Sequence, residues 1–251
     1  MELTPQFTAS KYEILRGLVG STAYGTGLEG QEDRDELGVF IEPPERVIGL
    51  NPLDHVIFRT QPEGVPSGPG DLDLTRYSLR KFMRLAVQGN PSIIVLLWLP
   101  DYLTKSYHGE WLISCREALI SQEMGKRFLG YLQGQVNRLL NKRAAKVNRN
   151  ELTERFGYDT KAAMHAARLA YQGLELIESG ALEMPIAKPL RTELLDIRQG
   201  KLTLEEALDY IREAEDRLKM AVDTFKVSVD KPVIDKFLVE AHRTFWASHQ
   251  I

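Results

Sequence analysis

The chain of 251 residues contains a single cysteine, Cys115, and this scarcity excludes two kinds of site. One thiol can form neither an intrachain disulfide nor a thiolate cage around a metal ion. Cys115 lies in the amphipathic run WLISCREALI. The pattern therefore predicts an inert thiol in the hydrophobic core.

Long apolar runs and several well-known catalytic motifs are also missing. No stretch approaches the roughly 20 apolar residues that a helix needs to cross a bilayer. The segment MELTPQFTAS lacks the basic-then-apolar order of a secretory signal, so we expect a cytoplasmic protein. Neither G-x-x-x-x-G-K-[ST] nor G-x-S-x-G occurs, which argues against a Walker-type ATPase and an α/β-hydrolase.

The formal net charge of −3 argues against a protein that coats nucleic acid without specificity. The charge is unevenly distributed, because residues 137–149, NRLLNKRAAKVNR, carry five cations and no acid. A basic strip on a mildly acidic protein fits an anionic ligand that binds at one place.

The order of patterns along the chain predicts a small α/β unit followed by a helical unit. The first ~75 residues show short β-rich runs and turns, and periodic helical patterns follow. We expect a strand at residues 71–74, a helix over 75–87, and a further helix over 158–179. Thr203 and Glu206 form a capping-box signature that predicts the start of another helix.

A stretch near the N-terminus, GSTAYGTGLEGQEDRDELGVF at residues 20–40, combines a Gly-Ser turn with closely spaced acids. Asp33 and Asp35 are two residues apart, so they share one side if LGVFI forms a strand. Adjacent carboxylates repel each other unless a cation lies between them, and oxygen ligands favour Mg²⁺. The turn at Gly20 and Ser21 offers backbone N–H groups and a hydroxyl that suit a phosphate. These parts predict a site for a metal–nucleotide; a solvated acidic turn is the alternative.

This stretch resembles the predicted nucleotidyltransferases of bacteria and their phages, which belong to the DNA polymerase β-like superfamily. In that family a G-S-x-A-Y-G motif precedes S-D-x-D-x-x-G-V, and here GSTAYGT precedes DRDELGVFIEPP. The runs DLTRYSLRKFMRLAVQGNPSIIVLLW and GYDTKAAMHAARLAYQGLELIESG are similar to later blocks of the family. Glu32 departs from the pattern, because the family usually has Ser at that position.

The resemblance implies an α+β fold, in which a small mixed β-sheet with helices forms the catalytic core and a helical domain follows. We expect the catalytic core at residues 1–105. The helical domain, at residues 106–251, is expected to contribute to nucleotide or acceptor binding.

The resemblance also implies a third carboxylate on a neighbouring strand, where it helps to activate the nucleophile. Asp71 and Asp73 are the candidates. Asp73 fits the family block D-x-x-x-Y-x-L-R-K-F, since it lies four residues before Tyr77. Asp71 is the alternative candidate for the third carboxylate. Asp33, Asp35 and Asp73 are then the expected catalytic residues and ligands of Mg²⁺ or Mn²⁺.

Lys161, His165 and Arg168 have the spacing i, i+4 and i+7, which places them on one face of the expected helix. Such a row of cations favours an anionic ligand, and the family block Y-D-x-K-x-x-x-H-x-x-R-L leads us to expect phosphate contact. A solvated basic face is the alternative. Tyr24 is expected to bind the nucleotide by stacking on its base, unless it packs under the turn.

The resulting expectation is a Mg²⁺-dependent nucleotidyltransferase. It would move a nucleoside monophosphate from an NTP, ATP or another, to an acceptor hydroxyl on an RNA end and release pyrophosphate. Two alternatives stay open: transfer onto a protein side chain, and a non-catalytic nucleotide sensor or antitoxin-like partner.

Overall fold

The computed structural model describes residues 4–28, 30, 33–62, 64–65, 67–140 and 150–251. The elements, in chain order, are α1 (Pro5–Lys11), β1 (Glu13–Leu18), α2 (Gly20–Tyr24), β2 (Arg34–Phe40), α3 (Pro44–Val47), β3 (His55–Arg59), β4 (Leu72–Ser78), α4 (Leu79–Val87), α5 (Pro91–Ile94), the 3₁₀ helix η1 (Val95–Trp98), β5 (Thr104–Lys105), α6 (Tyr107–Ser114), the 3₁₀ helix η2 (Arg116–Leu119), α7 (Gln122–Leu140), α8 (Asn150–Phe156), α9 (Thr160–Ser179), α10 (Lys188–Arg198), α11 (Leu204–Thr224) and α12 (Lys231–His249). The fold is therefore α+β, as expected.

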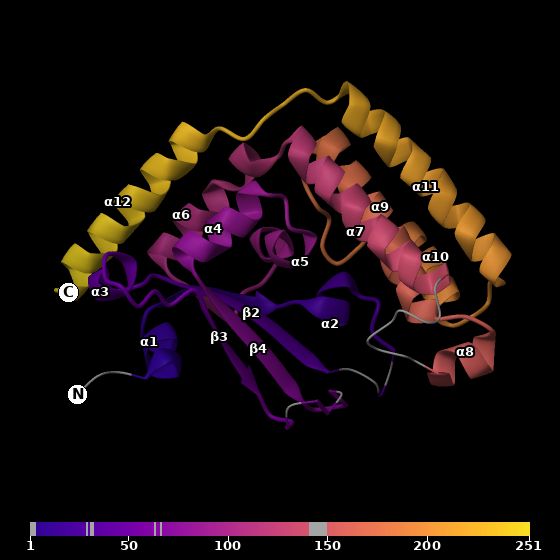
Figure 1. Ribbon diagram of the computed structural model, residues 1–251, viewed down its shortest axis with the longest axis horizontal. Helices are drawn as coiled ribbons and strands as arrows, with labels where there is room; N and C mark the ends of the chain where they lie inside the picture. Colours follow the sequence, from indigo (N-terminus) through magenta and orange to yellow (C-terminus); the bar gives the residue numbers. More distant parts are fainter. Residues whose placement is uncertain (1–3, 29, 31–32, 63, 66, 141–149) are drawn as a thin grey trace. The chain divides into compact units, whose positions relative to one another are not determined.

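The five strands form one mixed sheet in the order β3-β4-β2-β1-β5. Among the described strands, β2 and β4 are the only parallel pair, and the other pairings are antiparallel. Helix α1 lies on one side of the sheet, and α4 and α6 lie on the other (Figure 1). The sheet therefore has both faces partly covered, with β2 and β4 at its centre.

Side chains alternate between the two faces along each strand. Asp35 consequently shares a face of β2 with buried Leu37, whereas Glu36 points to the opposite face. Gly17 of β1 packs beneath the segment that contains η1, since a Cβ atom at this position would lie 3.5 Å from Leu96. The face that carries Asp35 is thus the one that this apolar segment covers near β1.

The described chain divides into two compact units. The first comprises Met1–Val87, Ser92–Leu119 and Val229–Ile251, and the second comprises Gln88–Pro91 and Ile120–Ser228. This division differs from the expected ranges 1–105 and 106–251 mainly because α12 belongs to the first unit. Whether the two units act as a catalytic and a binding domain stays a prediction.

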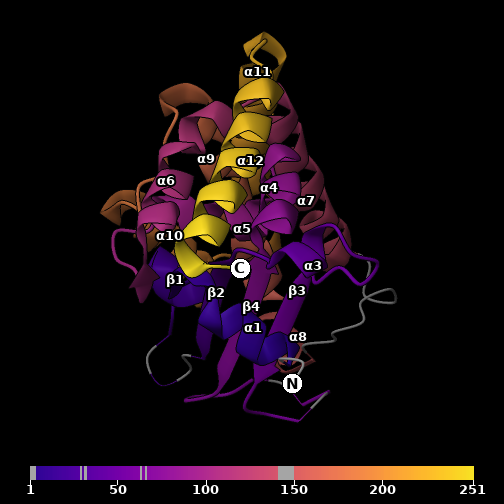
Figure 2. The ribbon, with the colours of Figure 1, turned by 90° about the vertical axis from the view of Figure 1, so that its left-hand side faces the viewer.

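Helix α12 packs against the first unit through aromatic and polar contacts, and it runs beside α4 (Figure 2). Phe245 meets Tyr12 edge to face, with 5.8 Å between ring centroids. Trp246 Nε1 donates a hydrogen bond of 2.8 Å to the carbonyl oxygen of Glu42, whose carboxylate lies 3.2 Å from His242 Nε2. Because Glu42 is fully buried, these contacts fix α12 to the sheet domain.

In the second unit, α9 is the central helix and contacts α7, α8, α10 and α11. Gly173 permits close packing here, since a Cβ atom at this position would lie 2.9 Å from both Phe128 and Leu218. The capping box at Thr203 and Glu206 is present at the start of α11, as predicted. Within the described part of the chain, no helix has the length and apolarity required to span a membrane.

One local expectation was wrong. The pattern predicted a helix from Thr75, but β4 continues to Ser78 and α4 begins at Leu79. Pairing with β2 on one side and β3 on the other keeps this segment extended, and a sequence window contains neither partner.

Candidate active site

Three charged side chains lie in one row across three neighbouring strands. Asp35 of β2 is in register with Asp73 of the parallel strand β4, and Asp73 is in register with Arg59 of β3. Arg59 Nε lies 3.1 Å from Asp73 Oδ2. Two of the expected catalytic carboxylates therefore occupy paired positions on adjacent strands, and one of them forms an ion pair with an arginine.

Gly20 extends this row on the side of β1. The backbone N–H of Val19 donates a 2.9 Å hydrogen bond to the carbonyl of Asp35, which joins the end of β1 to β2. Gly20 has a φ of 67° and opens α2; a Cβ atom there would lie 3.0 Å from Asp35 Cγ and closer still to Oδ2. Only glycine lets the backbone approach the carboxylate this closely in this conformation. Ser21 follows within α2 and is half-buried.

Asp71 and Asp73 have different surroundings. Asp71 precedes β4, and its carboxylate accepts hydrogen bonds from the backbone N–H of Gly68 at 2.9 Å and from Thr60 Oγ1 at 3.0 Å. These contacts fix the turn that leads into the strand. Asp73 lies within β4 beside Asp35, so the arrangement supports Asp73 rather than Asp71 as the third carboxylate.

Asp33, the remaining acid of the expected set, comes directly before β2 and is half-buried. Among the described residues, no three His, Cys, Asp or Glu side chains gather into a group that could hold a metal ion. Asp35 and Asp73 form a register pair of carboxylates on adjacent strands. A donor set of carboxylates alone still fits Mg²⁺, which takes one or two protein carboxylates and completes its shell with water and phosphate oxygens. Glu32 lies outside the described residues.

The expected roles of Tyr24 and the basic residues depend on where each lies. Tyr24 is buried, with 7% of its surface exposed, which supports packing under the turn rather than a free ring for stacking. On α9, Lys161, His165 and Arg168 are half-buried and occupy one face, as the spacing predicted. Arg168 Nη1 donates to Gln172 Oε1 over 2.8 Å. Most of the basic strip, residues 141–149, lies outside the described residues.

The sequence matches a family model described as RlaP, the RNA repair pathway DNA polymerase beta family, over residues 3–241. The chain belongs to this family. Its members are nucleotidyltransferases, so the chain is an enzyme that transfers nucleoside monophosphates, as the opening motif predicted.

Two further comparisons add little to the family match. A nucleotidyltransferase-like protein from Exiguobacterium sibiricum 255-15 aligns with 87% of this chain and 71% of its own, at 13% identity and a TM-score of 0.30. A likeness at this level supports no statement about the site. No curated protein matches the sequence.

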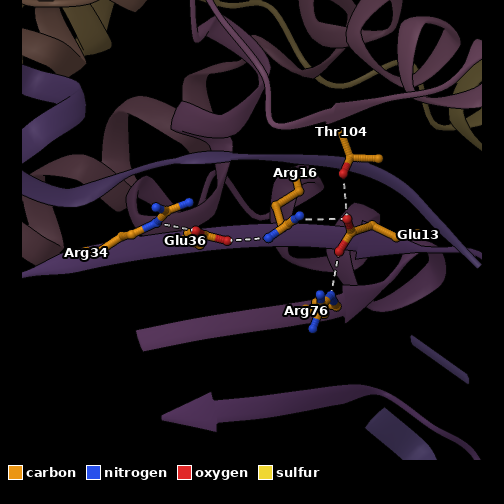
Figure 3. Close-up of polar contacts among 6 residues, drawn as sticks. All are labelled: Glu13, Arg16, Arg34, Glu36, Arg76 and Thr104. Atoms are coloured by element: carbon orange, nitrogen blue, oxygen red, sulfur yellow. Dashed lines mark hydrogen bonds and ion pairs between the residues drawn. The ribbon is translucent and has the colours of Figure 1, made fainter. Parts of the chain in front are cut away.

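In this member of the RNA repair pathway polymerase beta family, the opposite face of β2 carries an ionic network that the sequence analysis missed (Figure 3). Glu36 accepts hydrogen bonds of 2.6 Å from Arg16 Nη1 and from Arg34 Nε. Arg16 Nε also donates to Glu13, at 2.9 Å, and Thr104 Oγ1 donates to the same carboxylate at 2.7 Å. The network thus links β1, β2 and β5 behind the row of carboxylates.

The network also reaches β4, because Gly38 leaves space above β2. Arg76 of β4 forms an ion pair with Glu13 of β1 across the intervening strand. A Cβ atom on Gly38 would lie 3.0 Å from Arg76 Cγ and 3.3 Å from Glu13 Oε2, so a side chain there would crowd this pair. The strands that carry Asp35 and Asp73 are therefore joined on the far face by charge pairs as well as by their backbone hydrogen bonds.

Burial lowers the pKa of the Arg16 guanidinium, but the charge of Glu13 and the hydrogen bond to Glu36 outweigh it, so that the pKa stands above its ordinary value. The two carboxylates therefore favour the charged form of Arg16. One signal in the sequence could have revealed part of the network. Arg34 and Glu36 are opposite charges at i and i+2, which share one face of a strand.

Proposed function

We propose that this enzyme transfers a nucleoside monophosphate from an NTP to a hydroxyl group at an RNA end, in a Mg²⁺-dependent reaction that releases pyrophosphate. The observation that carries the proposal is the register pair Asp35 and Asp73 beside the Gly20 turn. It supplies two carboxylates next to a backbone that can approach a phosphate closely.

Asp35 and Asp73 would hold the metal ion together with Asp33, which forms the D-x-D motif with Asp35. A bound Mg²⁺ would neutralise the phosphate oxygens and polarise the α-phosphorus. Gly20 and Ser21 would bind the triphosphate through backbone N–H groups and the serine hydroxyl. These residues orient the α-phosphate against the acceptor.

The reaction requires one bond to form and one to break. The acceptor oxygen attacks the α-phosphorus, and the bond from that phosphorus to the bridging oxygen of the β-phosphate breaks, so that pyrophosphate carries away the electron pair. The hydroxyl proton must leave the acceptor during this step. We assign its acceptance to Asp73, because a carboxylate beside the metal ligand Asp35 lies where an activated hydroxyl would be held.

Lys161, His165 and Arg168 would bind phosphate groups of the nucleotide or of the acceptor backbone. Their support is the shared half-buried face of α9, since cations in a partly buried row gain more from an anion than exposed cations do. The buried position of Tyr24 supports a role beneath the turn that holds Ser21, and stacking on the base is the alternative.

An RNA end is favoured over a protein side chain as the acceptor because the description of the family names an RNA repair pathway. The discriminating assay offers each α-labelled NTP with Mg²⁺ to RNA oligonucleotides and to protein acceptors in parallel. Label on RNA supports the proposal. Label on protein alone would show that the acceptor is a protein side chain and not RNA. NTP binding without any transfer would favour a non-catalytic nucleotide sensor.

Asp35→Asn and Asp73→Asn should each reduce transfer by at least about a hundredfold, as expected for loss of a group that acts in the transition state. The matched control is Asp71→Asn, which changes an acid two residues away in a turn. It should retain most of the activity. If Asp71→Asn is inactive and Asp73→Asn is not, the assignment of the third carboxylate is wrong.

A further inference from the structure

Arg59 was not among the expected site residues, yet it contacts one of the two paired carboxylates. Its Nε lies 3.1 Å from Asp73 Oδ2, and 47% of its side chain is exposed. Asp73 is 22% exposed. The ion pair thus lies at the rim of the candidate active site, with its arginine reachable from solvent.

The charges in this row explain why an arginine is placed here. Asp35 and Asp73 are register partners on adjacent parallel strands, and two neighbouring carboxylates repel each other. The single positive charge of Arg59 offsets one of the two negative charges. Because Arg59 comes from the edge strand β3, it approaches Asp73 from the side opposite Asp35.

We propose that Arg59 is a built-in counter-ion that competes with the divalent cation for Asp73. This inference rests on the proposed metal site. In the metal-free enzyme the guanidinium holds Oδ2 of Asp73. Metal binding at Asp35 and Asp73 opens that pair, because a divalent cation beside the guanidinium repels it. Arg59 is accordingly a positioning residue, which acts on Asp73 rather than on the substrate.

Arg59 would thus lower the metal affinity of the site, and removal of its contact with Asp73 would improve metal binding. Arg59 places one positive charge beside Asp73, and Arg59→Gln removes that charge from the site. An exposed pair of this kind is weak and is screened by salt. We therefore expect Arg59→Gln to bind Mn²⁺ roughly three- to tenfold more tightly than the natural enzyme, with the difference shrinking as monovalent salt is added.

The experiment titrates Mn²⁺ alone into the full chain and measures free Mn²⁺ by electron paramagnetic resonance. Arg84→Gln is the control, because it removes one exposed arginine charge from α4 in the same unit and keeps the same net charge as Arg59→Gln. Its affinity should stay within about twofold of the natural enzyme. Melting curves with EDTA and with Mn²⁺ provide a second measurement: Arg59→Gln should melt below the natural enzyme in EDTA and recover this difference in Mn²⁺.

The outcomes separate this inference from the proposed function. If Asp35→Asn binds Mn²⁺ as tightly as the natural enzyme, the metal site is wrong and the role of Arg59 falls with it. If Asp35→Asn loses Mn²⁺ while Arg59→Gln behaves like Arg84→Gln, the metal site stands and the role of Arg59 is wrong. A melting temperature lowered equally with and without Mn²⁺, or a raised KM for NTP at unchanged Mn²⁺ affinity, likewise overturns it.

Discussion

Replacement of Glu36 by glutamine tests whether the ionic network stabilises the strand that carries Asp35. The carboxylate is almost fully buried, with 1% of the side chain exposed, and it accepts two hydrogen bonds of 2.6 Å from guanidinium groups. Glutamine keeps the shape and one acceptor oxygen. It replaces the other oxygen with an amide NH₂ group, which would face an arginine donor.

The expected loss in the free energy of unfolding can be worked out for each of the two ion pairs of Glu36. A hydrogen bond to a charged group contributes about 1.5–3 kcal/mol. Arg34 is 55% exposed, so its share is at most about 1 kcal/mol. Arg16 retains Glu13 after the substitution, which keeps the loss below the roughly 3–5 kcal/mol of a fully broken buried pair. We expect a loss of about 2–3 kcal/mol, or roughly 5–10 °C in melting temperature.

Thermal unfolding followed by circular dichroism measures this loss. Glu45→Gln is the matched control, because Glu45 is an exposed acid of the same unit and should change stability by less than about 0.5 kcal/mol. Gly38→Ala should also destabilise the protein, since its methyl group would crowd the ion pair between Arg76 and Glu13. If Glu36→Gln melts within about 1 °C of the control, the network does not hold the strands and the reasoning is refuted.

Ser21→Ala should weaken NTP binding about five- to thirtyfold in a fluorescence titration, which corresponds to about 1–2 kcal/mol. An unchanged affinity would show that the turn at Gly20 and Ser21 has only a structural role. Lys161→Gln and Arg168→Gln should each raise KM for NTP or for the acceptor, by a factor that shrinks with salt; changes below about twofold in both constants would leave α9 a solvated basic face. Burial, and then repulsion from His249, lowers the pKa of His108 from 6.5, so the unfolded chain takes up the proton first and stability falls as the pH drops below about 6.5. His108→Asn should flatten this decline in melting curves between about pH 7 and pH 5, and an unchanged slope would assign it to other groups.

The local parts of the site could be predicted from the sequence because short-range rules govern them. The Gly-Ser turn, the helix it opens and the strand after Asp33 all lie within twenty-one residues. The capping box at Thr203 is similarly local. Such features depend on backbone preferences and on the alternation of side chains, which a sequence window contains.

The contacts between strands could not be predicted in the same way. Arg59 meets Asp73 only because β3 pairs with β4, and Asp73 meets Asp35 only because β4 runs parallel to β2. Strand order and register arise from the packing of the whole sheet. His242 had no expected role for the same reason, since its partner Glu42 lies 200 residues earlier in the chain.

The return of α12 to the first unit has a consequence for the order in which the enzyme matures on the ribosome. All the carboxylates of the candidate site are synthesised within the first 73 residues, but the helix that packs on Tyr12 and Glu42 emerges only after the entire second unit. At a synthesis rate of about 5–20 residues per second, α12 is made roughly ten to thirty seconds after the strands of the sheet. The second unit contains the long continuous segment Ile120–Ser228, so it can complete its packing before α12 is made. The sheet that carries the proposed catalytic carboxylates therefore lacks the packing of α12 until translation has passed this helix.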